Sequence, residues 1–110
     1  MTYTINGKEW TEFDINKRCA ELLGLEVSKE QWMHYGDRDE NLVLIGKVRD
    51  SYAVNYTRNP ADTWHIIEKC WDELMCSMYD GHIHWVDLTQ EHQCTKLTAA
   101  CICLIEENKA

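Results

Sequence analysis

The sequence predicts an α+β protein that folds as a single domain over residues 1–110. Some segments repeat apolar residues with the period of a helix, and others are β-branched or alternate polar with apolar residues. In chain order we expect a helix at 14–23, strands at 42–48 and 51–56, a helix at 60–78, a strand at 82–88 and a helix at 95–107. Five tryptophans, five tyrosines and 45% hydrophobic residues can supply one core. These observations predict three helices that cover a central antiparallel sheet.

The first helix has clear start and stop signals. Thr11 followed by Asp14 resembles a capping box, and Gly24 is a natural stop just past the last helical residue. Between these signals one apolar stripe contains Ile15, Cys19, Leu22 and Leu23. The stripe predicts a helix that packs against a core.

Two strands with a polar turn before them follow the first helix. LVLIGKV at 42–48 is β-branched and SYAVNY at 51–56 alternates, so we expect a hairpin around Arg49 and Asp50. The turn at 36–41 contains the charged residues Asp37, Arg38, Asp39 and Glu40. We expect the side chains of such a turn to be exposed and not to pack against the core.

The segment 60–78 predicts the longest helix. Asn59 suits the N-cap, Pro60 the first helical position and Asp62 the first turn. One continuous apolar arc contains Thr63, Trp64, Ile67, Cys70, Trp71, Leu74, Met75 and Met78. We expect this arc to bury Trp64, Ile67, Trp71 and Leu74. The alternative is an exposed binding stripe that contains Trp10, Trp64, Trp71, Met75 and Met78, of which we expect only Met75 and Met78 to reach an interface.

The last two elements are predicted from shorter patterns. HIHWVDL at 82–88 reads as a strand with Ile83 and Trp85 toward the core. Thr95 can cap the final helix, whose buried stripe contains Leu97, Ala100, Cys101, Leu104 and Ile105.

Three segments resemble a family of small tailed-phage and prophage proteins. They are INKRCAELLG at 15–24, NYTRNPADTWHIIEK at 55–69 and KLTAACICLI at 96–105, whereas residues 26–54 depart from the family pattern. The family is described as phage ABA-sandwich domain proteins, and NinX-like phage proteins look similar. The resemblance implies an α-β-α sandwich with a sheet of about three to five strands, a phage or prophage origin and a bacterial cytoplasmic location. The family has no established activity, so the resemblance transfers no site residue.

The charge balance limits the choice of partner. A net charge of −8 without a Lys/Arg cluster repels phosphate, so we expect no direct nucleic-acid binding. We also expect no membrane span, because apolar runs are short. The predicted function is a phage accessory protein that contacts a host or phage protein with a basic surface, such as a defence component that it inhibits. The charge pattern is typical of a surface that serves solubility, and the alternative is that it serves recognition, with Asp37, Asp39 and Glu40 as the candidate contacts.

Six cysteines and five histidines raise the question of a metal site. Residues 1–10 lack a secretory pattern, so we expect free thiols and no cofactor. Cys101 and Cys103 diverge by about 200° on a helix and cannot share one ion. The alternative is a zinc-binding module or metal-dependent enzyme that uses His82, His84, His92 and Cys94. A strand would place His82 and His84 on the same face. Because no nucleophile motif is present, we expect no catalysis.

Overall fold

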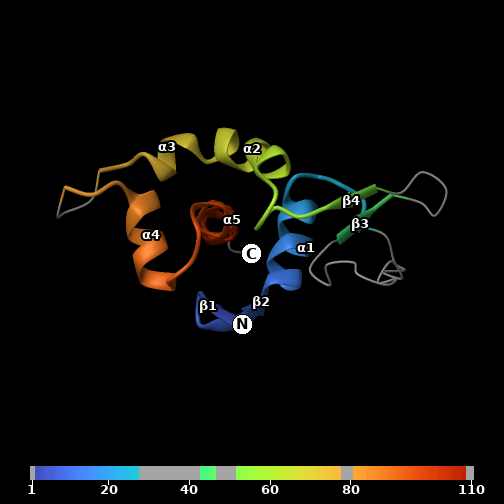
Figure 1. Cartoon of the computed structure of the whole chain (residues 1–110), viewed down its shortest axis with the longest axis horizontal. Coiled ribbons are helices and arrows are strands. Elements are labelled where there is room, and N and C mark those ends of the chain that lie inside the picture. The colour runs from blue at the N-terminus through green and yellow to red at the C-terminus, as the bar shows by residue number, and fades with distance from the viewer. Residues whose placement is uncertain (1, 28–42, 47–51, 78–80, 109–110) are drawn as a thin grey trace.

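The structure, a computed structural model, describes residues 2–27, 43–46, 52–77 and 81–108. Its elements are β1 (Thr2–Ile5), β2 (Lys8–Thr11), α1 (Glu12–Leu22), β3 (Val43–Ile45), β4 (Tyr52–Val54), α2 (Pro60–Lys69), α3 (Trp71–Leu74), α4 (His84–His92) and α5 (Lys96–Glu107). Figure 1 shows α5 near the centre, with α1 and α4 on either side, α2 and α3 above and the β1–β2 hairpin below. Helices and antiparallel strands enclose one hydrophobic core, so the predicted α+β class is confirmed.

The final helix α5 occupies the middle of this core. Every residue from Thr98 to Ile105 is buried, and α5 packs against α1, α2 and α4. The segment LTAACICLI at 97–105 carries no charge, and a helix that is apolar on all sides must be buried on all sides. The predicted single stripe was therefore too narrow, and α5 is a central element instead of a cover for a sheet.

The chain opens with a hairpin that is not among the predicted elements. Strands β1 and β2 pair antiparallel with Ile5 opposite Lys8, and the turn residues Asn6 and Gly7 both have positive φ, of 53° and 80°. Asn-Gly is the preferred pair for a two-residue turn of this kind. This dipeptide between TYTI and KEWT was the signal for the hairpin.

The predicted capping box and glycine stop of the first helix are confirmed, although α1 begins at Glu12, two residues before the predicted start, and ends at Leu22. The Thr11 hydroxyl accepts a hydrogen bond from the Asp14 N–H at 3.1 Å, and the Asp14 carboxylate accepts one from the Thr11 N–H at 3.1 Å. At the other end Gly24 has a φ of 81°, and the N–H groups of Gly24 and Leu25 donate to the carbonyls of Glu21 and Ala20. This pair of bonds is a Schellman motif, which only a residue with positive φ completes.

The predicted antiparallel pairing of the two middle strands is confirmed over Val43–Ile45 and Tyr52–Val54, and the predicted turn around Arg49 and Asp50 lies outside the described residues. The predicted strand at 82–88 is wrong. Val43 lies opposite Val54 in β3–β4, whereas HIHWVDL leads into α4. Read with a period of 3.6, Trp85 and Leu88 share one face, and the polar TQEH continues the helix. Within the described ranges the four strands form two separate two-stranded sheets, so a single sheet of three to five strands is not confirmed.

The predicted helix at 60–78 starts correctly but ends early. The Asn59 side chain accepts a hydrogen bond from the Ala61 N–H at 3.0 Å, and Pro60 takes the first helical position. Helix α2 stops at Lys69, and after Cys70 the chain continues as the short α3. The Cys70 N–H donates to the Ile66 carbonyl at 2.9 Å and the Cys70 carbonyl accepts from the Leu74 N–H at 2.8 Å, so Cys70 ends α2 and caps the start of α3.

Candidate functional site

The outer side of α2 and α3 exposes large apolar side chains. Trp64 is 53% exposed, Trp71 is 47% exposed and Met75, just after α3, is 40% exposed. The prediction that Trp64 and Trp71 are buried is wrong, whereas the predicted burial of Ile67 and Leu74 is confirmed. We call Trp64, Trp71 and Met75 the tryptophan face.

The helical spacing explains the error. The side of α2–α3 that faces the core contains Thr63, Ile66, Ile67, Cys70 and Leu74. At about 100° per residue, the tryptophan face lies roughly a quarter-turn away from the middle of this core side. The apolar arc predicted from the sequence was wide enough to merge these two neighbouring faces.

The other members of the alternative stripe do not join this face. Trp10 lies on β2, which Figure 1 places on the opposite side of α5 from α2 and α3. Its ring is partly buried and lies 5.1 Å from the Lys8 ammonium. Met78 lies outside the described residues. The exposed stripe therefore consists of two tryptophans and one methionine at positions i, i+7 and i+11.

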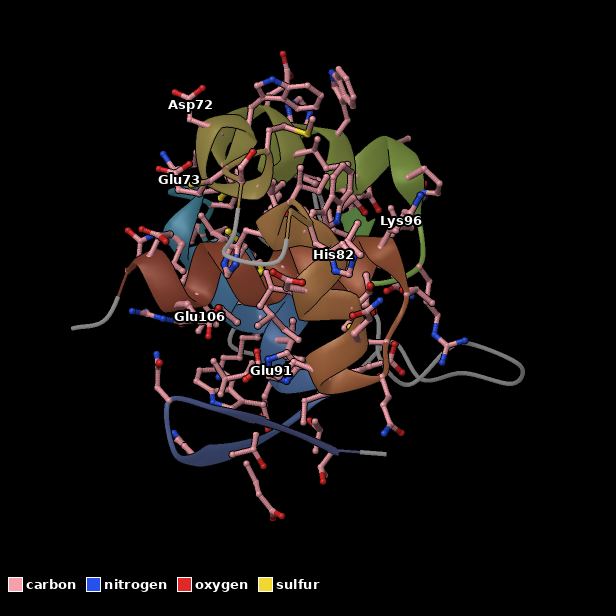
Figure 2. The ribbon with its side chains drawn as sticks, turned by 90° about the vertical axis from the view of Figure 1, so that its left-hand side faces the viewer. Asp72, Glu73, His82, Glu91, Lys96 and Glu106 are labelled. Carbon is pink, nitrogen blue, oxygen red and sulfur yellow. The ribbon has the colours of Figure 1, made fainter. Side chains whose placement is uncertain are left out.

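Carboxylates border the tryptophan face. Glu68 is four residues after Trp64 and three before Trp71, and Asp72 is three residues before Met75, so both are immediate neighbours of the face. Both are exposed, and we call them the acidic rim. Figure 2 shows Asp72 projecting from α3 into open space, with Glu73 beside it. The whole segment from Pro60 to Met75 holds four carboxylates and one lysine.

A buried polar network anchors the start of α2 to α1. The Asn16 amide donates to the Asn55 side-chain oxygen at 3.1 Å and to the Thr57 hydroxyl at 3.3 Å, and the Asn16 oxygen accepts from the Thr57 N–H at 3.0 Å. All three residues are buried. Buried polar groups that satisfy one another fix the relative position of the elements that carry them.

Further bonds extend this anchor to the N-terminus of α2. The Asp62 carboxylate accepts from the Asn55 N–H at 2.9 Å, and the Thr63 hydroxyl donates to the Tyr56 and Asn59 carbonyls. Arg58 donates two hydrogen bonds to the Glu12 carboxylate, at 3.2 and 2.9 Å. The run NYTRNP, which contributes to the phage-family resemblance, therefore has a structural role in positioning α2.

An open cleft of about 370 Å³ lies where α1, β4 and α2 meet. Its lining consists of Leu23, Leu25, Tyr52, Val54, Tyr56, Asp62 and His65. Burial raises the pKa of Tyr56, so its hydroxyl stays protonated at neutral pH. Asp62 and His65 share this lining, and the Asp62 carboxylate accepts the hydrogen bond from the Asn55 N–H.

The predicted zinc ligands are spread along α4 and the segments that flank it. His82 precedes α4 and its Nδ1 lies 3.5 Å from Asp87 Oδ1. His84 and His92 are eight residues apart, about 12 Å along a helix axis. Among the described residues no group of three or more His, Cys, Asp or Glu is arranged to hold a metal ion. The geometry gives the zinc alternative no support.

The two α4 histidines instead lie near the α5 carboxylate Glu106. His84 Nδ1 and His92 Nε2 are buried without a hydrogen-bond partner, and His92 Nε2 is 3.8 Å from Glu91 Oε2, too far for a hydrogen bond. Burial raises the pKa of Glu106, and the proximity of His92 and His84 opposes that shift. Figure 2 shows Glu91 and Glu106 on the same side of the molecule.

The remaining predicted residues are placed as follows. Asp37, Asp39 and Glu40 lie outside the described residues, so their role as contacts stays a prediction. All six cysteines are described and are free. The Cys19 thiol of α1 donates to the Cys101 carbonyl at 3.7 Å. Cys101 and Cys103 are both buried in α5, two residues apart on a regular helix, so their predicted divergence is confirmed.

Searches against protein-family models, curated proteins and solved structures find no match. The resemblance to phage ABA-sandwich proteins therefore stays a prediction. In the parts of the chain that the structure describes, every helix is too short or too polar to traverse a bilayer.

Proposed function

We propose that this protein is a small phage or prophage accessory protein that acts by protein contact, through the tryptophan face, and not by catalysis. The observation that carries the proposal is the exposure of Trp64 and Trp71 on a helical segment whose other side is anchored in the core. Tryptophan is enriched among the residues that dominate binding energy at protein interfaces. The α-β-α sandwich of the resembled family remains part of this proposal as a prediction.

The exposed area is large enough to anchor a complex. A tryptophan buries about 150–250 Å² when it is fully covered, so covering the exposed half removes about 100 Å² from water. At about 25 cal/mol per Å², each tryptophan contributes roughly 2.5 kcal/mol to binding before entropy costs. Two such tryptophans, with Met75 one turn after Trp71, form a hot-spot cluster of ordinary size.

The acidic rim indicates the chemistry of the partner. Glu68 and Asp72 flank the tryptophan face on one side, and carboxylates attract Lys or Arg side chains. From Trp64 to Met75 the face spans about 17 Å, the length of three turns of a helix. We therefore expect a partner segment that presents large apolar side chains beside Lys or Arg, as the basic surface of a host defence protein would.

A displayed library of helical peptides of about 20 residues tests this proposal with a defined probe. The peptides are selected against the full chain and then against a Trp64→Ala/Trp71→Ala variant. We expect the enriched peptides to carry a positive net charge and large apolar residues, and to lose binding to the variant. Binding should weaken between ~50 mM and ~500 mM salt, because screening removes the attraction of the rim.

A Glu68→Gln/Asp72→Asn variant is the matched control for charge. It keeps both tryptophans, so it should bind the same peptides with a slower association rate and less salt dependence. Enriched peptides that are neutral or acidic, or that bind the double tryptophan variant equally well, would contradict the proposal. The charge would then serve solubility alone.

A further inference from the structure

The first hairpin and the first helix bring three basic side chains to one cleft. This cleft has a volume of about 340 Å³, and its lining consists of Lys8, Trp10, Asp14, Lys17, Arg18 and Glu21. Positions 8 and 10 share one face of a strand, and positions 14, 17, 18 and 21 share one face of a helix, so the spacing builds a wall from β2 and a wall from α1. We call this opening the basic cleft. Lys8 is distant in sequence from Lys17 and Arg18, and the fold gathers them.

Two strong donors in the basic cleft lack an acceptor among the described residues. Arg18 Nη1 lies 3.6 Å from Glu21 Oε1, too far for a hydrogen bond, although the Arg18 side chain is only 34% exposed. The Trp10 indole N–H is buried, and no described residue accepts its hydrogen bond. The Lys8 ammonium lies 5.1 Å from the centre of the same indole ring and adds positive charge there. Guanidinium and indole nitrogens can only donate, so both groups need an acceptor from elsewhere.

The two acids of the lining are already engaged. The Asp14 carboxylate accepts the Thr11 N–H at 3.1 Å in the capping box, and Glu21 is the acid beside Arg18. Lys17 is exposed and forms no ion pair with the described part of the chain. The basic cleft therefore presents positive charge and N–H donors, although the chain as a whole has a net charge of −8.

We propose that the basic cleft binds the phosphate or carboxylate group of a small ligand. The planar fork of Arg18 can donate to two oxygens of such a group, and Lys8 and Lys17 add attraction. The Trp10 N–H supplies a further donor to the same group. A long polyanion such as nucleic acid is disfavoured, because the rest of the chain is acidic. The volume of the cleft lies within the ordinary range for small-molecule sites.

The basic cleft is separate from the tryptophan face. Figure 1 places β2 and the hairpin on the opposite side of α5 from α2 and α3. Binding of a small anion in this cleft therefore does not depend on what the tryptophan face binds, and either proposal can fail without the other.

Nuclear magnetic resonance of the isotope-labelled full chain tests the site, because the Trp10 indole N–H belongs to its lining. Inorganic phosphate and succinate are titrated separately at neutral pH and constant ionic strength. We expect the Trp10 indole signal, identified by its loss in Trp10→Phe, to shift and to saturate. The Trp85 indole should not shift, since its N–H already donates to the Lys96 carbonyl at 2.8 Å. Saturation at a lower concentration of phosphate assigns a phosphate-bearing ligand, and saturation at a lower concentration of succinate assigns a carboxylate-bearing one.

Three variants separate a built site from general charge attraction. Arg18→Gln should raise the dissociation constant of the anion roughly tenfold, because a charge-assisted hydrogen bond is lost. Lys17→Gln should raise it about threefold, because Lys17 is exposed. Lys69→Gln is the matched control, since it removes the same charge from the end of α2, across α5 from the cleft, and should leave the constant unchanged.

The spread of the indole signals verifies that each variant is folded. If Arg18→Gln is not folded, the comparison of Lys17→Gln with Lys69→Gln decides the question. The proposal is overturned if the Trp10 signal shifts with neither anion. It is equally overturned if Lys69→Gln weakens binding as much as the variants of the basic cleft do.

Discussion

The variant Asn16→Ala tests whether the buried polar network holds α1 against the start of α2. The Asn16 side chain makes three hydrogen bonds to Asn55 and Thr57. Alanine leaves the buried Thr57 N–H without this acceptor, which costs about 1–3 kcal/mol, and loses the two donated bonds, which adds about 1 kcal/mol. We expect the free energy of unfolding to fall by about 3 kcal/mol and the melting temperature by roughly 10–15 °C.

Asn59→Ala is the matched control for this truncation. Asn59 is exposed, and its side chain caps α2 with one hydrogen bond to the Ala61 N–H. Loss of such a cap costs about 1 kcal/mol. Urea unfolding of both variants, followed by fluorescence, measures the two values. If Asn16→Ala costs no more than Asn59→Ala, the network does not position α2 and the reasoning fails.

Three further predictions concern single side chains. Leu74→Ala should cost about 2–5 kcal/mol in urea unfolding, and its exposed neighbour Met75→Ala less than about 1 kcal/mol; equal losses would contradict the assignment of the two faces. Burial raises the pKa of Glu106 above 4.5, so the folded state binds the Glu106 proton more tightly than the unfolded chain does. The stability that this proton contributes is present at low pH and is lost as the pH rises through the folded pKa. Glu106→Gln should remove that decline from the pH dependence of unfolding, and a decline that persists unchanged would refute it. Burial raises the pKa of Cys94 to about 11, so iodoacetamide at neutral pH should alkylate exposed Cys76 before Cys94, and the reverse order by mass spectrometry would refute it.

Local signals predicted the helix boundaries best. The capping box at Thr11, the glycine stop at Gly24 and the Asn59-Pro60 start all act within one turn of chain, so the sequence contains their whole cause. The signal for the hairpin of β1 and β2 is also local, because the Asn6-Gly7 dipeptide alone favours its two-residue turn.

Long-range packing was not predictable from the same patterns. HIHWVDL fits a period of two as well as the start of a helix, and only its docking against α5 decides between them. The central position of α5 follows from its uncharged run, which is apolar on all sides of the helix. A search for one apolar stripe does not distinguish such a helix from one that packs on the core with a single face.

The candidate site was only the alternative prediction for a related reason. Trp64 and Trp71 are as apolar as Ile67 and Leu74, so periodicity places all four in one arc. Which part of that arc meets the core depends on how α2 rotates when Asn55, Thr57 and Asp62 are anchored. The network that sets this rotation joins residues about 40 positions apart, beyond the reach of pattern analysis.

The affinity of an enriched basic peptide for three purified chains tests the central claim most directly. Trp71→Ala removes a side chain of the tryptophan face, whereas Tyr52→Ala removes an aromatic that is 51% exposed but lies on β4 by the cleft. Calorimetry should show the dissociation constant rising about 30-fold for Trp71→Ala, the loss of about 2 kcal/mol expected of a hot spot, and less than about threefold for Tyr52→Ala. Equal weakening by both variants, or no weakening by Trp71→Ala, would contradict binding through the tryptophan face.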